Sequence, residues 1–127
     1  MSIRNPNARN RESILDNDLV FAVFLVTSSI RKTTAWMIEH GIYNPYKNGG
    51  AYTQAGLYRS AERSEHFLEF RHRRDVRHEI EGEAPDDKEL AWAVATIEER
   101  LPKVLEHLRV LEIRLAALKH INALPTK

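Results

Sequence analysis

The chain has 127 residues, enough for about one domain with a single core, and its 43% hydrophobic and 29% charged residues are typical of a folded globular protein. Its 19 basic and 18 acidic side chains give a net charge of +1, so any binding to nucleic acid would depend on a local cluster of charge. The absence of cysteine excludes disulfides, thiolate zinc sites and a cysteine nucleophile.

Targeting signals and domain boundaries are read from the ends of the chain and its longest apolar run. The N-terminus lacks the apolar core of a signal peptide, and the run at 19–26 is too short to cross a bilayer as a helix. We therefore expect a soluble, cytoplasmic protein that is not bound to a membrane. Residues 1–12 are polar, Asn-rich and basic, which predicts a flexible tail, and residues 13–127 are predicted to form one helical domain.

The first predicted helix opens with the capping pattern Ser13-Ile14-Leu15-Asp16, in which the Asp16 carboxylate would lie near the positive end of the helix dipole. Apolar residues keep helical spacing as far as Met37, and Gly41 is the predicted C-terminal cap. Because residues 19–26 are apolar on every side, we expect this helix to be the most buried element.

A long connection follows at residues 41–57, where Asn-Pro and Asn-Gly-Gly indicate turns and leave room for a short additional helix. Its aromatic rings could stack on bases or anchor a protein partner. The alternative is that they seal the end of a helical bundle. The candidate partner-binding tyrosines of this loop are Tyr43, Tyr46 and Tyr52, and the fourth tyrosine, Tyr58, lies at its edge.

Two further helices are predicted, over residues 58–81 and 87–121, with Asp86 or Asp87 capping the second of them after a turn that contains Gly82 and Pro85. Together the three long segments predict an all-α fold, an up-down bundle in which a short fourth helix could occupy the tyrosine loop.

The last of these helices carries apolar residues at alternating steps of four and three, which is a heptad seam. The seam fits packing inside the bundle about as well as packing against a second copy, and further apolar positions outside it indicate more than one neighbour. Pro102 lies one position past the seam, so we expect a kink and not a break. We predict a homo-oligomer, with the seam as its contact: Leu90, Val94, Ile97, Leu101, Val104, Leu108, Leu111, Leu115 and Leu118.

All but one of the arginines of the 58–81 segment fall in one sector of a helical wheel, with most of the acidic residues opposite. Guanidinium groups match pairs of phosphate or carboxylate oxygens, so this row would suit a nucleic-acid backbone or an acidic protein surface. The alternative is a row that faces water or the glutamates of the last helix. The predicted partner-binding residues of the row are Arg59, Arg63, Phe70, Arg73, Arg74 and Arg77.

An arginine and a histidine in this segment suggest a second function. Arg71 and His78 are seven residues apart, which places them on one face of a helix. The pair resembles the Arg-x(4–6)-His motif of helical ribonucleases of the HEPN type, and the resemblance is limited to these two residue types at that spacing. It implies an endoribonuclease that acts by general acid–base chemistry near a dimer cleft, with the arginine stabilising phosphate charge. That family often has Asn after the arginine, where this chain has His72.

No metal or cofactor is expected. Glu69 and His72, with Glu65 nearby, form one Glu-x-x-His step of the kind used by di-iron bundles, but such a site needs the motif on two helices and the chain has no second copy. No phosphate-binding glycine loop or Ser-His-Asp context is present either. We therefore predict a small non-enzymatic interaction or regulatory protein, of the adaptor or inhibitor type. It would self-associate and bind an acidic protein or nucleic acid, with no small-molecule substrate evident.

Overall fold

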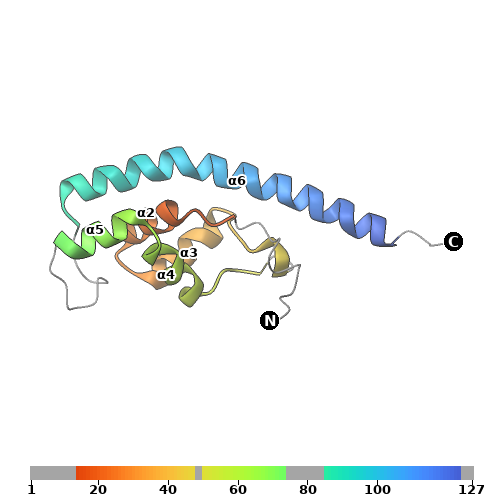
Figure 1. The fold of residues 1–127 in the computed structure, drawn as a ribbon, viewed down its shortest axis with the longest axis horizontal. Helices are drawn as coiled ribbons and strands as arrows, with labels where there is room; N and C mark the ends of the chain where they lie inside the picture. The colour runs from red at the N-terminus through yellow and green to blue at the C-terminus, as the bar shows by residue number, and fades with distance from the viewer. Residues whose placement is uncertain (1–13, 48–49, 74–84, 124–127) are drawn as a thin grey trace, which may run out of the picture.

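The computed structural model describes residues 14–47, 50–73 and 85–123, which form an all-α structure (Figure 1). The long C-terminal helix lies across a group of shorter helices that precede it in the chain. Apart from an isolated bridge between Asn44 and Gly50, the described residues contain no β structure. In chain order the elements are α2 (Asn17–Thr27), α3 (Ile30–Glu39), the 3-10 turn η1 (Pro45–Lys47), α4 (Gln54–Glu62), α5 (Glu65–Arg73) and α6 (Asp87–Ala123).

Helix α2 is the centre of the molecule, as its apolar sequence predicted. It begins at the cap Asp16, whose Oδ1 accepts hydrogen bonds from the N–H groups of Asp18 (3.0 Å) and Leu19 (3.1 Å). Every residue from Leu19 to Leu25 is buried. This is possible because α3, α4, α5 and α6 all pack against α2, so no side of it faces water over that length.

The prediction of one helix from Asp16 to Gly41 is wrong, because the chain turns between α2 and α3. Ser28 adopts the left-handed conformation (φ 60°) and its N–H donates to Phe24 O at 2.7 Å, which ends α2. Ser29 then caps α3 by accepting from Lys32 N at 3.3 Å. The helical spacing of apolar residues continues through this turn, so the sequence pattern does not indicate it. The cap predicted at Gly41 is confirmed by its φ of 77° directly after α3.

The predicted 58–81 helix is also divided, at Arg63 and Ser64 between α4 and α5. The Ser64 hydroxyl is buried and donates to Asp18 Oδ1 at 2.7 Å, and it accepts from His66 N at 3.3 Å. One turn earlier, Ser60 donates to Asn17 Oδ1 at 2.8 Å. The two serines tie the α4–α5 junction to the start of α2, and the second of them interrupts the helix because its oxygen replaces a backbone acceptor.

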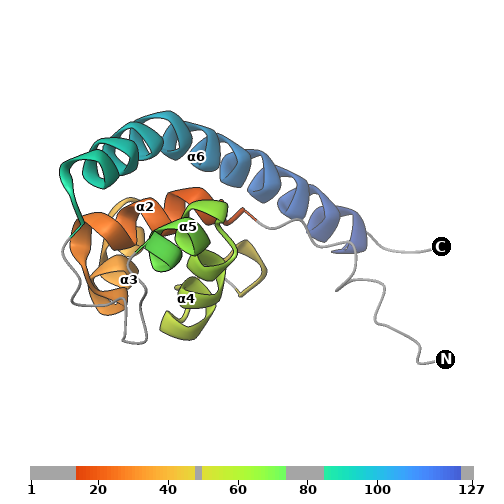
Figure 2. The same cartoon turned by 60° about the vertical axis from the view of Figure 1, so that its left-hand side comes forward.

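Helix α6 forms as predicted. Asp86 and Glu89 make a reciprocal capping box, in which Glu89 N donates to Asp86 Oδ1 (2.8 Å) and Asp86 N donates to Glu89 Oε1 (2.7 Å). The helix continues through Pro102 for 37 residues, about 55 Å of rise, and is visibly bowed (Figure 2). Its C-terminal turns extend past the group of shorter helices.

The core lies between α2, α5 and α6 and is built around Phe21. Its ring meets Phe67 and Phe70 edge-on, at centroid distances of 5.3 and 5.7 Å, and lies 5.9 Å from Trp92 of α6. No helix in the described part of the chain is long and apolar enough to cross a membrane.

Candidate interaction surface

The predicted seam of α6 is partly buried and partly exposed, and this division decides which residues are free to bind a partner. Val104, Leu108 and Leu111 are buried, but Val94 is 48% exposed and Leu118 is 55% exposed. The other seam residues are half-buried: Leu90, Ile97, Leu101 and Leu115. Only the middle of the seam therefore belongs wholly to the core of this chain.

In its first turns α6 faces α2 with residues one position before the seam. Glu89, Ala93 and Thr96 are buried there, and Arg100 is half-buried. Small Ala93 allows the two helices to approach closely. Arg100 Nη1 lies 2.7 Å from Asp16 Oδ2, and its Nη2 lies 3.7 Å from Asp18 Oδ2.

The bond between Arg100 and Asp16 affects the charge of the guanidinium. It raises the pKa of the Arg100 guanidinium above its usual range, since the neighbouring carboxylate favours the charged form. Because Glu89, Ala93 and Thr96 are buried towards α2, the seam residues of this half of α6 lie to the side of that line.

The result is a one-sided apolar surface, called here the α6 flank. At about 100° per residue its members lie within about 80° of one another, beside the line that faces α2. The backbone of α6 lies close to α2 and η1 alone among the described elements. Val94 and Leu105 of the flank are exposed, whereas Ile97 and Leu101 are half-buried and pack partly on the core. The opposite side of α6 is polar and exposed, with Glu99, Lys103 and Glu106. The flank consists of Leu90, Val94, Ile97, Leu101 and Leu105.

The predicted arginine row does not lie on one helix, because Arg59 belongs to α4 and Arg73 to α5, on either side of the break at Ser64. Arg59 and Arg63 are both exposed. The side chains of Arg71 and Arg73, and all of Arg74, Arg77 and His78, lie outside the described residues. The wider row and the ribonuclease-like pair Arg71 and His78 therefore stay predictions.

Phe70 is not set among the arginines at the surface. It is 1% exposed and packs edge-on against Phe21 in the core. A large aromatic side chain gains more from burial than from exposure beside charges, so the expectation that it helps to bind a partner is not supported by its position.

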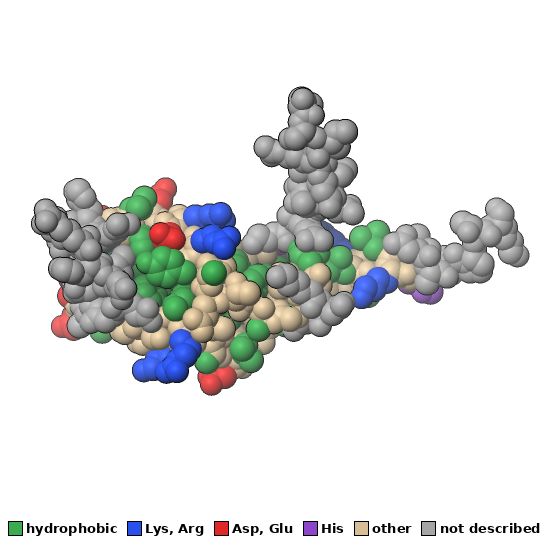
Figure 3. Space-filling model, turned by 90° about the horizontal axis from the view of Figure 1, so that it is seen from below, with side chains coloured by type: hydrophobic (Ala, Val, Ile, Leu, Met, Phe, Trp, Pro, Cys, Tyr) green, Lys and Arg blue, Asp and Glu red, His purple; other side chains and the backbone are tan. Residues whose placement is uncertain are grey.

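The exposed cations on the shorter helices include two that the sequence reasoning missed. Arg31 and Lys32 are exposed on α3, after the Ser29 cap. Two adjacent basic residues in the first turn after a Ser-Ser pair are the sequence signal that could have indicated them. On the face turned away from α6, the Lys and Arg side chains that the structure describes lie in separate clusters (Figure 3).

The tyrosines of the 41–53 loop lie against the core. This position agrees with the alternative prediction, in which the rings seal the end of the helical group. Tyr43, Tyr46 and Tyr52 are half-buried and pack on the hydrophobic cluster. Hydrogen bonding with the Glu112 carboxylate of α6 favours the protonated phenol and raises the pKa of Tyr43, and burial raises the pKa of Tyr52 to about 12. The loop thus connects the shorter helices to α6 and keeps only part of each ring at the surface.

No group of three side chains that could hold a metal ion occurs among the described residues. Glu65 and Glu69 are exposed on α5, and His66 Nδ1 lies 3.8 Å from Glu69 Oε2.

Comparison with known proteins adds no relative to this description: no protein-family model matches the chain, and no curated protein or solved structure matches it either.

Proposed function

We propose that this protein is a small non-enzymatic interaction module that binds an acidic partner through its exposed arginines and self-associates through the α6 flank. The observation that carries the first half is a difference among the arginines. Arg100 is bonded to Asp16, and Arg109 bonds to Glu106 at 2.7 Å. Arg59 and Arg63 form no ion pair with any carboxylate in the described part of the chain.

The position of these two arginines favours a shared ligand. They are four residues apart at the end of α4, a spacing that places side chains on the same side of a helix. Glu62 is exposed between them in the sequence and pairs with neither. Two adjacent guanidinium groups without an internal partner can each donate a forked pair of hydrogen bonds to a carboxylate or phosphate.

The test replaces both arginines, as Arg59→Glu with Arg63→Glu, and measures binding to labelled polyglutamate and to labelled duplex DNA. We expect the parent to bind one of these probes at low salt and the double variant to bind it at least about tenfold more weakly. A DNA-binding parent would show a log–log salt slope of about −0.9 for each phosphate contacted, and the variant a smaller slope.

The matched control is Arg109→Glu with Arg114→Glu on α6. Both double variants change the formal charge by −4, from +1 to −3, so loss of binding in both would indicate net charge and not a site. Equal binding by the parent and the α4 variant would show that these arginines are not the binding surface.

The second half of the proposal rests on the α6 flank. Its residues keep the spacing of a helical seam over about 22 Å, and Val94 and Leu105 among them are large apolar side chains that remain exposed. Association about a two-fold axis brings the same patch of both subunits together, so one apolar stripe on a long helix supplies both sides of the contact. A second copy of this chain is therefore the proposed occupant.

A further inference from the structure

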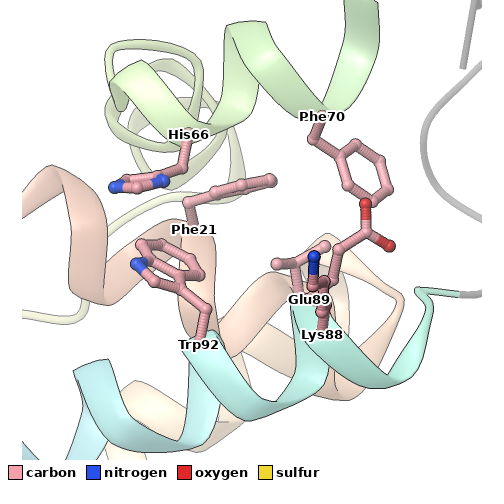
Figure 4. A pocket seen from close by; sticks show the side chains of 7 residues that line it. Phe21, His66, Phe70, Lys88, Glu89 and Trp92 are labelled. Atoms are coloured by element: carbon pink, nitrogen blue, oxygen red, sulfur yellow. The ribbon is translucent and has the colours of Figure 1, made fainter. Parts of the chain in front are cut away.

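A cavity of about 150 Å³ lies between α5 and the first turns of α6, with α2 behind it (Figure 4). Its apolar walls are Phe21 and Leu25 of α2, Phe70 of α5 and Trp92 of α6. An apolar cavity of this size can hold a benzene ring. No sequence motif indicated it, because its walls come from three separate helices.

The polar groups of the cavity lie along two of its edges. His66 lies against Trp92, with ring centroids 4.2 Å apart and ring planes tilted by 35°, and both rings lie to one side of Phe21. Lys88 and Glu89 approach from the first turn of α6, on the side of Phe70. The cavity is thus mainly aromatic, with ionisable side chains around it.

The two charges on α6 differ in what they already bind. Glu89 is 6% exposed, accepts a hydrogen bond from Asp86 N at 2.7 Å, and sits in the first turn of a helix, where the dipole favours a negative charge. Lys88 is exposed and has no ion pair with a carboxylate among the described residues. The ammonium group of Lys88 is therefore the charge that is left for a ligand.

We propose that this cavity is a binding site for a small aromatic carboxylate. The ring lies against Phe21, Phe70 and Trp92, and the carboxylate pairs with the Lys88 ammonium at the edge. This site is independent of the proposed function, because its side chains belong neither to the arginine surface nor to the α6 flank.

The experiment titrates the protein with phenylacetate, benzyl alcohol and benzylamine, which carry a similar ring with negative, neutral and positive groups. The chain has two tryptophans, and only Trp92 lines the cavity, whereas Trp36 of α3 stacks on His40. The indole N–H signals of the two tryptophans in a ¹H–¹⁵N NMR spectrum therefore report on the site and on a reference position in the same sample.

We expect phenylacetate to shift the Trp92 signal with a Kd of about 1 mM, the range for a ligand this small. Benzyl alcohol should bind about two- to fivefold more weakly, as expected for loss of one partly exposed ion pair, and benzylamine should bind most weakly. Lys88→Ala should reduce the affinity for phenylacetate to that for benzyl alcohol. Lys103→Ala, an exposed lysine elsewhere on α6, should change nothing.

Three results would overturn the proposal. The first is saturating phenylacetate without movement of the Trp92 signal. The second is benzylamine as the tightest ligand, which would mean that Glu89 and the aromatic rings select a cation. The third is equal phenylacetate binding by the parent and Lys88→Ala. Leu25→Phe should fill the cavity and remove binding of all three probes. If that variant does not fold, the comparison of phenylacetate binding by the parent and by Lys88→Ala still tests the proposal.

Discussion

Helices α2 and α6 are both rich in apolar residues but differ in how many neighbours surround them. Helix α2 has 11 residues, seven of them in one unbroken buried run, because four other helices pack around it. Helix α6 has 37 residues and packs mainly against α2, so several of its large apolar side chains remain exposed, including Ile113 and Leu118. Burial is therefore set by the surrounding helices and not by the hydrophobicity of a segment alone.

The same substitution in both helices would give the sharpest contrast. Leu19 of α2 is 1% exposed and Leu118 of α6 is 55% exposed. We expect Leu19→Ala to lower the free energy of unfolding by about 2–5 kcal/mol, through lost burial and a residual cavity. Leu118→Ala should change it by less than about 0.5 kcal/mol. Urea denaturation of both variants measures this difference, and similar losses would mean that α6 is as enclosed as α2.

A smaller effect is expected at high pH from the loop that joins these two regions. An unfolded tyrosine releases its proton near pH 10.0, whereas burial raises the pKa of Tyr52 to about 12 in the folded chain. Between these values the folded state holds a proton that the unfolded state has lost, so stability falls as pH rises from 10 to 12.

Unfolding measured along this pH range should show that fall, and Tyr52→Phe should reduce its slope. A Tyr52→Phe variant with the same pH dependence as the parent would show that this phenol is not protected by the fold.

Much of the fold followed from the sequence, and the errors have a common physical cause. A helix start close to Asp16, the cap at Gly41 and the whole of α6 were predicted, because cap residues and long apolar repeats are local signals. Both missed breaks lie at serines, Ser28–Ser29 and Ser64, where the apolar spacing continues across the break, and α4 begins at Gln54, before the predicted start at Tyr58. Ser64 accepts from His66 N in place of a backbone acceptor and is held by its bond to Asp18, 46 residues away, which periodicity does not detect.

The candidate site was less predictable for a related reason. The wheel that placed Phe70 beside the arginines assumed one continuous helix, and the break at Ser64 changes the direction of everything after it. The buried line of α6 was also shifted by one residue in its first half, where Glu89, Ala93 and Thr96 face α2, and this depends on a tertiary contact that periodicity does not specify. Arg59 and Arg63 are exposed, and their binding to a partner stays a prediction.

The measurement that tests the account most directly is the mass of the protein in solution, since we propose that a second copy covers the exposed apolar side chains of the α6 flank. Sedimentation equilibrium of the parent at micromolar concentration should give twice the chain mass of 14.7 kDa. Val94→Glu with Leu105→Glu should give a folded monomer, because each charge would be placed in an apolar contact. Ala95→Glu, on an exposed part of α6 away from the flank, should remain a dimer. A parent that sediments as a strict monomer across this range would contradict the account.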